Sequence, residues 1–251
     1  SICNEWMNQY PVIFLSLKDI DGLTFEDAYG QLVAQIADLY KEYTYLLECA
    51  EIDEDDKKIF LDLKAGKADK VQITRSLGTL MKMLQIYYHK PVILLLDEYD
   101  VPVAKASNHG YYNEMLDIMK GIMSTALKDN QALRFAVITG CLKIAKESIF
   151  TGTNNFVSDT IRDSRYNEYF GFTQTEVDKI LNDSGCIEHA ENVREWYDGY
   201  HFGEVDVYCP WDVMNYLRDL QHDIMAKPES YWKNTSDNAI IRSFIEYAGT
   251  N

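Results

Sequence analysis

Three short, nearly continuous apolar segments, separated by long amphipathic helices, constrain the fold of this chain most strongly. They cover residues 11–17, 91–96 and 134–140. Such runs are typical of strands buried on both faces of a parallel sheet, and strands that alternate with helices are joined by right-handed crossovers. We therefore predict an α/β fold with a parallel sheet. Apolar periodicity predicts helices over 25–49, 53–66, 73–88 and 111–127.

The sequence changes character near residue 170. A short strand over 156–161 is the last one expected. We therefore expect an α/β core over residues 1–170 and a helical subdomain over residues 171–251. Helical patterns follow one another, with no convincing strand between them, over 173–182, 190–197, 211–220 and 238–247.

Charge and cysteine usage narrow the class of protein. Lys and Arg number 24 against 40 Asp and Glu, a formal charge of −16. That balance argues against a surface that binds nucleic acid over its whole extent, since a phosphate backbone needs a basic face. No segment has the roughly 20 apolar residues of a membrane span, and the N-terminus lacks the pattern of a signal peptide. The five cysteines are scattered, which favours free thiols and a cytoplasmic location.

The strongest chemical signal is the strand that runs into Asp97 and Glu98. Ligands of open α/β sheets bind at the carboxyl ends of the strands. Asp97 there can hold a hydrated magnesium ion, and Glu98 can polarise a water for attack on a phosphoryl group. Thr139, at the end of the next strand, suits a sensor of the terminal phosphate. The alternative is a solvated acidic turn, with Thr139 ending a strand and Gly140 permitting a turn.

The phosphate-binding element that would complete such a site is not found in the sequence. A nucleotide bound in this way needs a G-x-x-x-x-G-K-[ST] loop, and no glycine precedes Lys-Ser or Lys-Thr at that spacing. The chain therefore contains half of a nucleotide site.

Short motifs spread along the chain make a resemblance specific. They are PVIFLSLK at 11–18, LLDEYDVP at 95–102, ALKDN at 126–130, ITG at 138–140, AKESIF at 145–150, NN at 154–155, YFGFT at 169–173, WYDGY at 196–200 and PW at 210–211. In this order they resemble the predicted AAA-ATPase-like family of bacterial P-loop proteins, close to the signal-transducing ATPases. Full-length members often carry a C-terminal PD-(D/E)XK nuclease-like domain.

The resemblance implies a P-loop-ATPase-like core that lacks its P-loop strand, followed by a helical lid subdomain. It places the Walker B residues at Asp97 and Glu98 and the sensor at Thr139. It also implies ATP and Mg²⁺ as the ligands of a parent protein that works as a nucleotide-driven switch. The family begins with a Walker A segment, and this chain starts just after it, so we expect the isolated chain to be inactive. The family usually has Arg where Lys143 stands, so no arginine-finger role is transferred.

Other motif residues receive weaker assignments. The roles of Tyr99 and Asp100 stay open, and a turn is favoured for Asn154 and Asn155. A solvated helix start is favoured over an ion pair for 146–147. Packing is favoured for the aromatic segment 196–203, with His201 as a weak candidate for contact with the nucleotide.

The absent strand has a structural consequence. In related ATPases it is central in the sheet, and its loss would leave backbone groups unpaired. We therefore expect a fragment whose sheet closes up, pairs with another chain or accepts a donated strand. A contiguous sheet that is fully paired within one chain would contradict donation.

Two other functions are weighed against an ATPase module. The chain could be a degenerate module for protein–protein interaction, including self-association through its incomplete sheet, with the acidic surface and the aromatic helical half as its working parts. A metal-dependent nuclease built on Asp97, Glu98 and a lysine is less favoured, because the spacing of Asp then Glu-x-Lys is not found and the charge opposes it.

Overall fold

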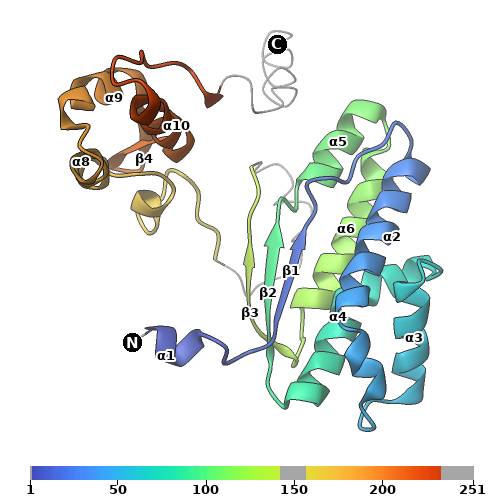
Figure 1. Cartoon of the computed structure of the whole chain (residues 1–251). Helices are drawn as coiled ribbons and strands as arrows, with labels where there is room; N and C mark the ends of the chain where they lie inside the picture. Colours follow the sequence, from blue (N-terminus) through green and yellow to red (C-terminus); the bar gives the residue numbers. More distant parts are fainter. Residues whose placement is uncertain (1, 142–156, 233–251) are drawn as a thin grey trace. The chain divides into compact units, whose positions relative to one another are not determined.

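The computed structural model describes residues 2–141 and 157–232. The chain forms two compact units, residues 1–155 and 156–251 (Figure 1). The boundary that we expect at residue 170, between an ATPase-like core and a lid, stays a prediction. The first unit contains α1 (Ile2–Trp6), β1 (Val12–Ser16), α2 (Phe25–Glu42), the 3₁₀ helix η1 (Thr44–Glu48), α3 (Glu54–Lys64), α4 (Lys70–Tyr88), β2 (Val92–Asp97), α5 (Val101–His109), α6 (Tyr112–Leu127) and β3 (Leu133–Ile138).

The three strands of the first unit form one parallel sheet in the order β1-β2-β3, which confirms the predicted α/β class. Val12 pairs with Ile93 and Ser16 with Asp97, so the carboxyl ends of β1 and β2 lie level with each other. The sheet is contiguous, and no gap separates these strands. The expectation that a donated strand fills the middle of the sheet is therefore wrong. Within the described ranges, no further strand pairs with the outer edges of β1 and β3.

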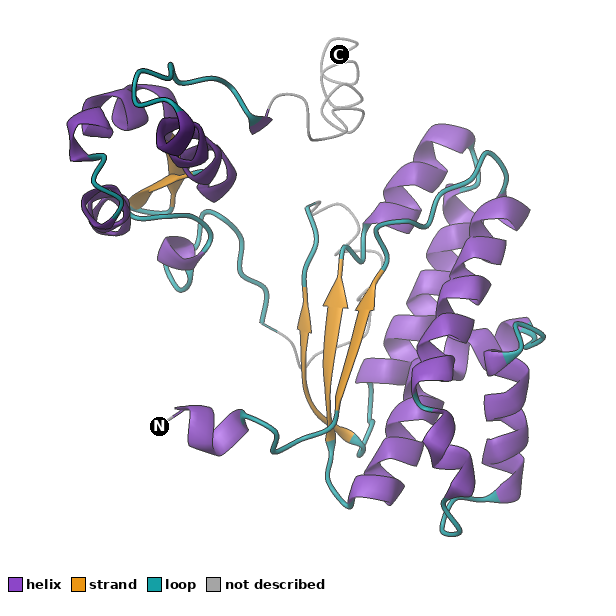
Figure 2. Cartoon of the chain, viewed as in Figure 1, coloured by secondary structure: helices purple, strands orange, loops and turns teal. Residues whose placement is uncertain are grey.

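Helices cover one face of this sheet (Figure 2). Alternate strand residues such as Ile13, Leu15 and Leu94 point into that core and are buried, together with the apolar stripes of α2, α4 and α6. Local signals fix the helix starts as the sequence predicts. Thr24 caps α2 by accepting a hydrogen bond from Asp27 N at 3.2 Å. Asp53 caps α3, so the acidic run from 53 to 56 is a helix terminus.

The opposite face of the sheet is exposed. Phe14 is 59% exposed on β1, and Val137 is 47% exposed on β3. Trp6 of α1 contacts this face, edge-on to Phe135 with ring centroids 5.5 Å apart. Parallel sheets usually have both faces covered, so an apolar face left open to solvent is unusual.

The second unit is mixed α/β rather than purely helical. Its two strands, β4 (Asp198–Phe202) and β5 (Val205–Tyr208), form an antiparallel hairpin. Gly203, at φ 60°, occupies the first position of the two-residue turn, where a positive φ favours glycine. The expectation of helices without strands here was wrong for residues 198–208. The unit contains η2 (Asn167–Tyr169), α8 (Gln174–Asp183), η3 (Ile187–His189), α9 (Ala190–Tyr197), β4 (Asp198–Phe202), β5 (Val205–Tyr208) and α10 (Pro210–His222).

Its core explains two of the family motifs. Phe172 forms an isolated antiparallel bridge with Tyr208, with hydrogen bonds of 3.0 and 2.8 Å between their backbones. Tyr197 and Tyr208 are buried, whereas Trp196 and Tyr200 are exposed. The aromatic motifs therefore serve packing in part, as the sequence favours.

Three segments differ in secondary structure from the sequence-based expectation. α2 ends at Glu42 and a 3₁₀ helix follows, so the helix expected over 25–49 is interrupted. α5 occupies 101–109, where only a loop is expected. Residues 157–161 contain no strand. In the ranges that the structure describes, no helix is long and apolar enough to cross a membrane.

Candidate nucleotide-site residues at the carboxyl edge of the sheet

Asp97 and Thr139 meet at the carboxyl edge of the sheet. Asp97 is the last residue of β2, and Thr139 directly follows β3. The Thr139 backbone N–H donates to Leu96 O at 2.9 Å, and the Thr139 hydroxyl donates to Asp97 Oδ1. The two predicted site residues, 42 positions apart in sequence, thus share a hydrogen bond.

Glu98 ends β2 because it adopts a left-handed backbone conformation, with φ at 53°. A non-glycine residue in this region is uncommon, and such residues cluster at functional sites. Burial raises the pKa of the Glu98 carboxyl, and the negative charges of Asp97 and Asp100 raise it further, while Lys18 opposes them. A raised pKa suits a carboxylate that exchanges protons with water.

Asp100 and Gly140 fasten the two strand ends together. Asp100 is 1% exposed, and its Oδ1 accepts a hydrogen bond from Cys141 N at 3.3 Å. A Cβ on Gly140 would lie 2.4 Å from Asp100 Oδ1 and 2.6 Å from Tyr99 Cε1. Gly140 is therefore required by close packing, and it does not supply the positive φ of a turn. This gives Tyr99 and Asp100, whose roles stay open in the sequence, a packing role.

Cys141 places a thiol beside these carboxylates. Burial and the charges of Asp100, Glu98 and Asp97 raise the pKa of its thiol. A higher pKa keeps the sulfur protonated, so the arrangement does not favour a thiolate mechanism.

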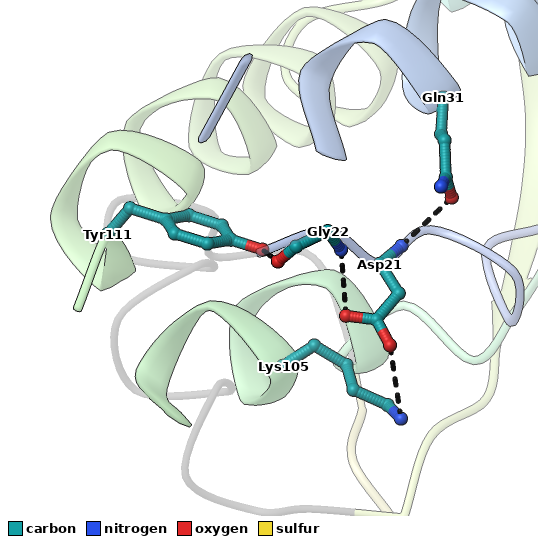
Figure 3. A network of polar contacts seen from close by, with 5 residues as sticks. All are labelled: Asp21, Gly22, Gln31, Lys105 and Tyr111. Carbon is teal, nitrogen blue, oxygen red and sulfur yellow. Dashed lines mark hydrogen bonds and ion pairs between the residues drawn. The ribbon is translucent and has the colours of Figure 1, made fainter. Parts of the chain in front are cut away.

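The loop between β1 and α2 is held against α5 and α6 by a polar network (Figure 3). Asp21 accepts from Gly22 N at 2.8 Å and pairs with Lys105 at 3.4 Å, and its own N–H donates to Gln31 Oε1 at 3.1 Å. The Tyr111 hydroxyl donates to Gly22 O at 2.6 Å. This network fixes the loop that carries Lys18, the residue whose charge acts on Glu98.

The sequence reasoning missed this network, because none of its residues belongs to a recognised motif. Gly22 offered a weak signal. A Cβ there would lie 2.6 Å from Ala28 N, so the loop can pass α2 this closely only with glycine.

The residues present fit a magnesium site that is completed by other ligands. Within the described ranges, no group of three His, Cys, Asp or Glu side chains is arranged to hold a metal ion. Mg²⁺ is commonly bound through one or two carboxylates plus waters and substrate phosphates. Asp97, with one oxygen already oriented by Thr139, suits that kind of partial donor set.

Of the remaining sequence candidates, His201 lies in the described ranges and belongs to the second unit. His201 is an exposed residue of β4, and its Nδ1 lies 2.6 Å from Asp206 Oδ1 on β5. Lys143, Asn154, Asn155 and residues 146–147 lie outside the described residues.

An open parallel sheet with carboxylates at the carboxyl ends of its strands is the arrangement of α/β proteins that bind ligands at that edge. The comparison with family models makes the class specific. The model described as "Predicted AAA-ATPase" matches residues 2–150, and the chain belongs to this family.

A curated relative is similar to part of the chain. It is the "Uncharacterized protein in vnfD 5'region" of Azotobacter chroococcum mcd 1, which is 32% identical over 139 residues. The match covers 55% of this chain and 27% of that protein. The chain therefore spans only about a quarter of the relative it matches. No solved structure gives a significant match.

Proposed function

We propose that this chain supplies the metal-binding and water-activating half of an ATPase site, in a protein that uses ATP and Mg²⁺ as a switch. The observation that carries the proposal is the hydrogen bond between Thr139 and Asp97 at the end of β2 and β3, next to the strained Glu98. A solvated acidic turn would not need a neighbouring strand to orient its first carboxylate.

Each residue has a distinct role in this proposal. Asp97 would hold a magnesium ion through a water of its shell, and the bound ion would supply neutralisation of the charge that develops on the phosphates. Glu98 orients and polarises the attacking water. Thr139 orients Asp97 through their hydrogen bond and would sense the terminal phosphate. The phosphates themselves need donors from a P-loop, for which this sequence has no match.

The test is ATP hydrolysis by the full-length protein with Glu98→Gln and Asp97→Ala. Removing a general base typically lowers a rate 10²–10⁴-fold, so we expect Glu98→Gln to lose most of its turnover while it keeps magnesium-dependent ATP binding. Asp97→Ala should lose both. Turnover that is unchanged by Glu98→Gln would contradict the proposal. Hydrolysis by residues 1–251 alone would overturn the expectation that this chain is inactive.

A second candidate function, self-association, is favoured by the exposed apolar face of the sheet. Phe14 and Val137 lie in one row across that face, on either side of Leu95, and are each about half exposed. We propose a second copy of this chain as the occupant, and the interaction would be the main function if the ATPase half-site is degenerate. Light scattering should give a dimer at micromolar concentration that Phe14→Lys and Val137→Lys convert to a monomer. A monomeric wild-type chain would contradict this candidate.

The cytoplasmic location of the protein also stays a prediction.

A further inference from the structure

Three side chains form a polar row across the carboxyl edge of the open sheet face. Ser16 of β1 is the register partner of Asp97 of β2, and Thr139 bonds to Asp97 from the other side. Because side chains alternate along a strand, Ser16 shares its face with exposed Val12 and Phe14, opposite buried Leu15. Asp97 therefore lies between two hydroxyl-bearing residues.

The two hydroxyls are used differently. That of Thr139 donates to Asp97, whereas Ser16 Oγ is buried and has no hydrogen-bond partner. In the described ranges this is true of only two other buried side-chain atoms, Ser76 Oγ and His189 Nε2. An unpaired buried hydroxyl destabilises a protein and calls for an explanation.

The backbone holds Ser16 in this place independently of its side chain. Its carbonyl accepts a hydrogen bond from Gln35 Nε2 of α2, and the next residue, Leu17, donates to Asp97 O at 3.0 Å. The backbone of Ser16 is therefore fixed beside that of Asp97, and the Ser16 hydroxyl lies on the same face of the sheet as the Asp97 side chain without a hydrogen bond of its own. A buried hydroxyl left unpaired at this place points to a ligand that would satisfy it.

We propose that Ser16 is a positioning residue of the magnesium site, whose hydroxyl binds a water in the metal shell held by Asp97. Its place in the row mirrors that of Thr139, so the metal water is oriented from β1 while the carboxylate is oriented from β3. This inference rests on the proposed function of Asp97. It needs no protein ligand other than Asp97, in keeping with the incomplete donor set at this edge.

Ser76 provides a matched control for a purely structural effect. Its hydroxyl is also buried and unpaired, but Ser76 belongs to helix α4. The backbone carbonyl of Ser76 accepts a hydrogen bond from the Tyr40 hydroxyl at 2.7 Å. Ser76→Ala removes the same atom from a helix instead of from the strand end that pairs with Asp97. A second matched pair lies at residue 16 itself, since Thr and Val have the same shape and both suit a strand, but only Thr has a hydroxyl.

The experiment is titration of the full-length protein with Mn²⁺ alone, followed by water-proton relaxation, which detects weak sites. We expect one site that is lost in Asp97→Ala. Removing a group that orients a metal's ligands typically costs 10–100-fold in metal affinity, so Ser16→Ala and Ser16→Val should bind about tenfold more weakly, and Ser16→Thr and Ser76→Ala like wild type.

The outcomes separate this inference from the proposed function. If Asp97→Ala loses the site but Ser16→Ala and Ser16→Val bind Mn²⁺ like wild type, the role of Ser16 is wrong and that of Asp97 stands. If wild type shows no site that depends on Asp97, the inference about Ser16 is wrong, whereas the proposed function, in which magnesium is bound together with ATP, is decided by the hydrolysis test. Should Ser16→Ala fail to fold, the Thr and Val variants decide the matter. Equal weakening in both of them would also overturn the inference.

Discussion

The two faces of the three-stranded sheet differ although the same strands build them. One face packs under α2, α4 and α6 and contains fully buried residues such as Leu94, whereas the other leaves Phe14 59% exposed. The covered face accounts for much of the stability of the first unit. The open face ends in the row of Ser16, Asp97 and Thr139, to which our proposal gives a chemical role rather than a packing role. On that proposal, stability and function belong to opposite sides of one sheet.

The largest expected effect compares one apolar residue from each face. Leu94→Ala should destabilise the protein by about 2–5 kcal/mol, because it leaves a cavity in the covered core. Phe14→Ala should change the free energy of unfolding by only about 0.5 kcal/mol, since the ring is mostly in solvent. Urea denaturation measures both. Equal losses would mean that the open face is covered in solution.

A smaller loss is expected where the two strand ends are fastened together. Gly140→Ala places a methyl group 2.4 Å from Asp100 Oδ1 and should cost about 1–3 kcal/mol through overpacking. Gly30→Ala, in helix α2 with no atom within 4 Å of the new methyl, is the control and should stabilise by about 0.5–1 kcal/mol. Thermal melts compare the two. A neutral Gly140→Ala would show that Asp100 is not fixed in this place.

The loss of a helix cap on the covered side should be smaller again. Thr24→Ala removes the oxygen that accepts from Asp27 N and should cost about 1 kcal/mol. Thr24→Ser keeps that oxygen and should be close to wild type. If both variants lose the same amount in urea denaturation, the hydroxyl does not cap α2.

The smallest effect concerns Glu98 and has a defined pH dependence. Its pKa is raised in the folded protein above the ordinary value of 4.5. The folded state then holds the proton more tightly, so the contribution of Glu98 to stability is present below pH 4.5 and is lost as the pH rises through the folded pKa. Glu98→Gln should therefore melt at a higher temperature than wild type at pH 7. That difference should shrink toward pH 4, whereas a constant difference would contradict the assigned cause.

Local sequence patterns predicted the strands and most helices of the first unit, but they missed helix α5 and the hairpin of the second unit. The apolar runs at 11–17 and 91–96 and the cap at Thr24 are local signals, and the structure confirms the strands and the helix start. Helix α5 was missed because Pro102 reads as a helix breaker, although proline is tolerated in a first turn. The β4–β5 hairpin was missed because its strands are short, although Tyr200-His201-Phe202 and Val205-Asp206-Val207 alternate apolar and polar residues on either side of Gly203.

Only the candidate site residues that belong to recognised motifs were predictable from the sequence. Asp97, Glu98 and Thr139 belong to motifs, and the fold brings Asp97 and Thr139 into contact. The position of Ser16 beside Asp97 was missed because it depends on the register between β1 and β2, which no local pattern contains. The packing role of Gly140 likewise requires the position of Asp100, a residue from a different strand end.

Magnesium-dependent binding of ATP by the full-length protein tests the central claim most directly. A ligand that binds only the folded state raises the melting temperature by mass action. We predict that ATP with Mg²⁺ raises the melting temperature more than ATP alone, and that Asp97→Ala abolishes the difference while the protein stays folded. An equal shift with and without Mg²⁺, or a magnesium effect that persists in Asp97→Ala, would contradict the account.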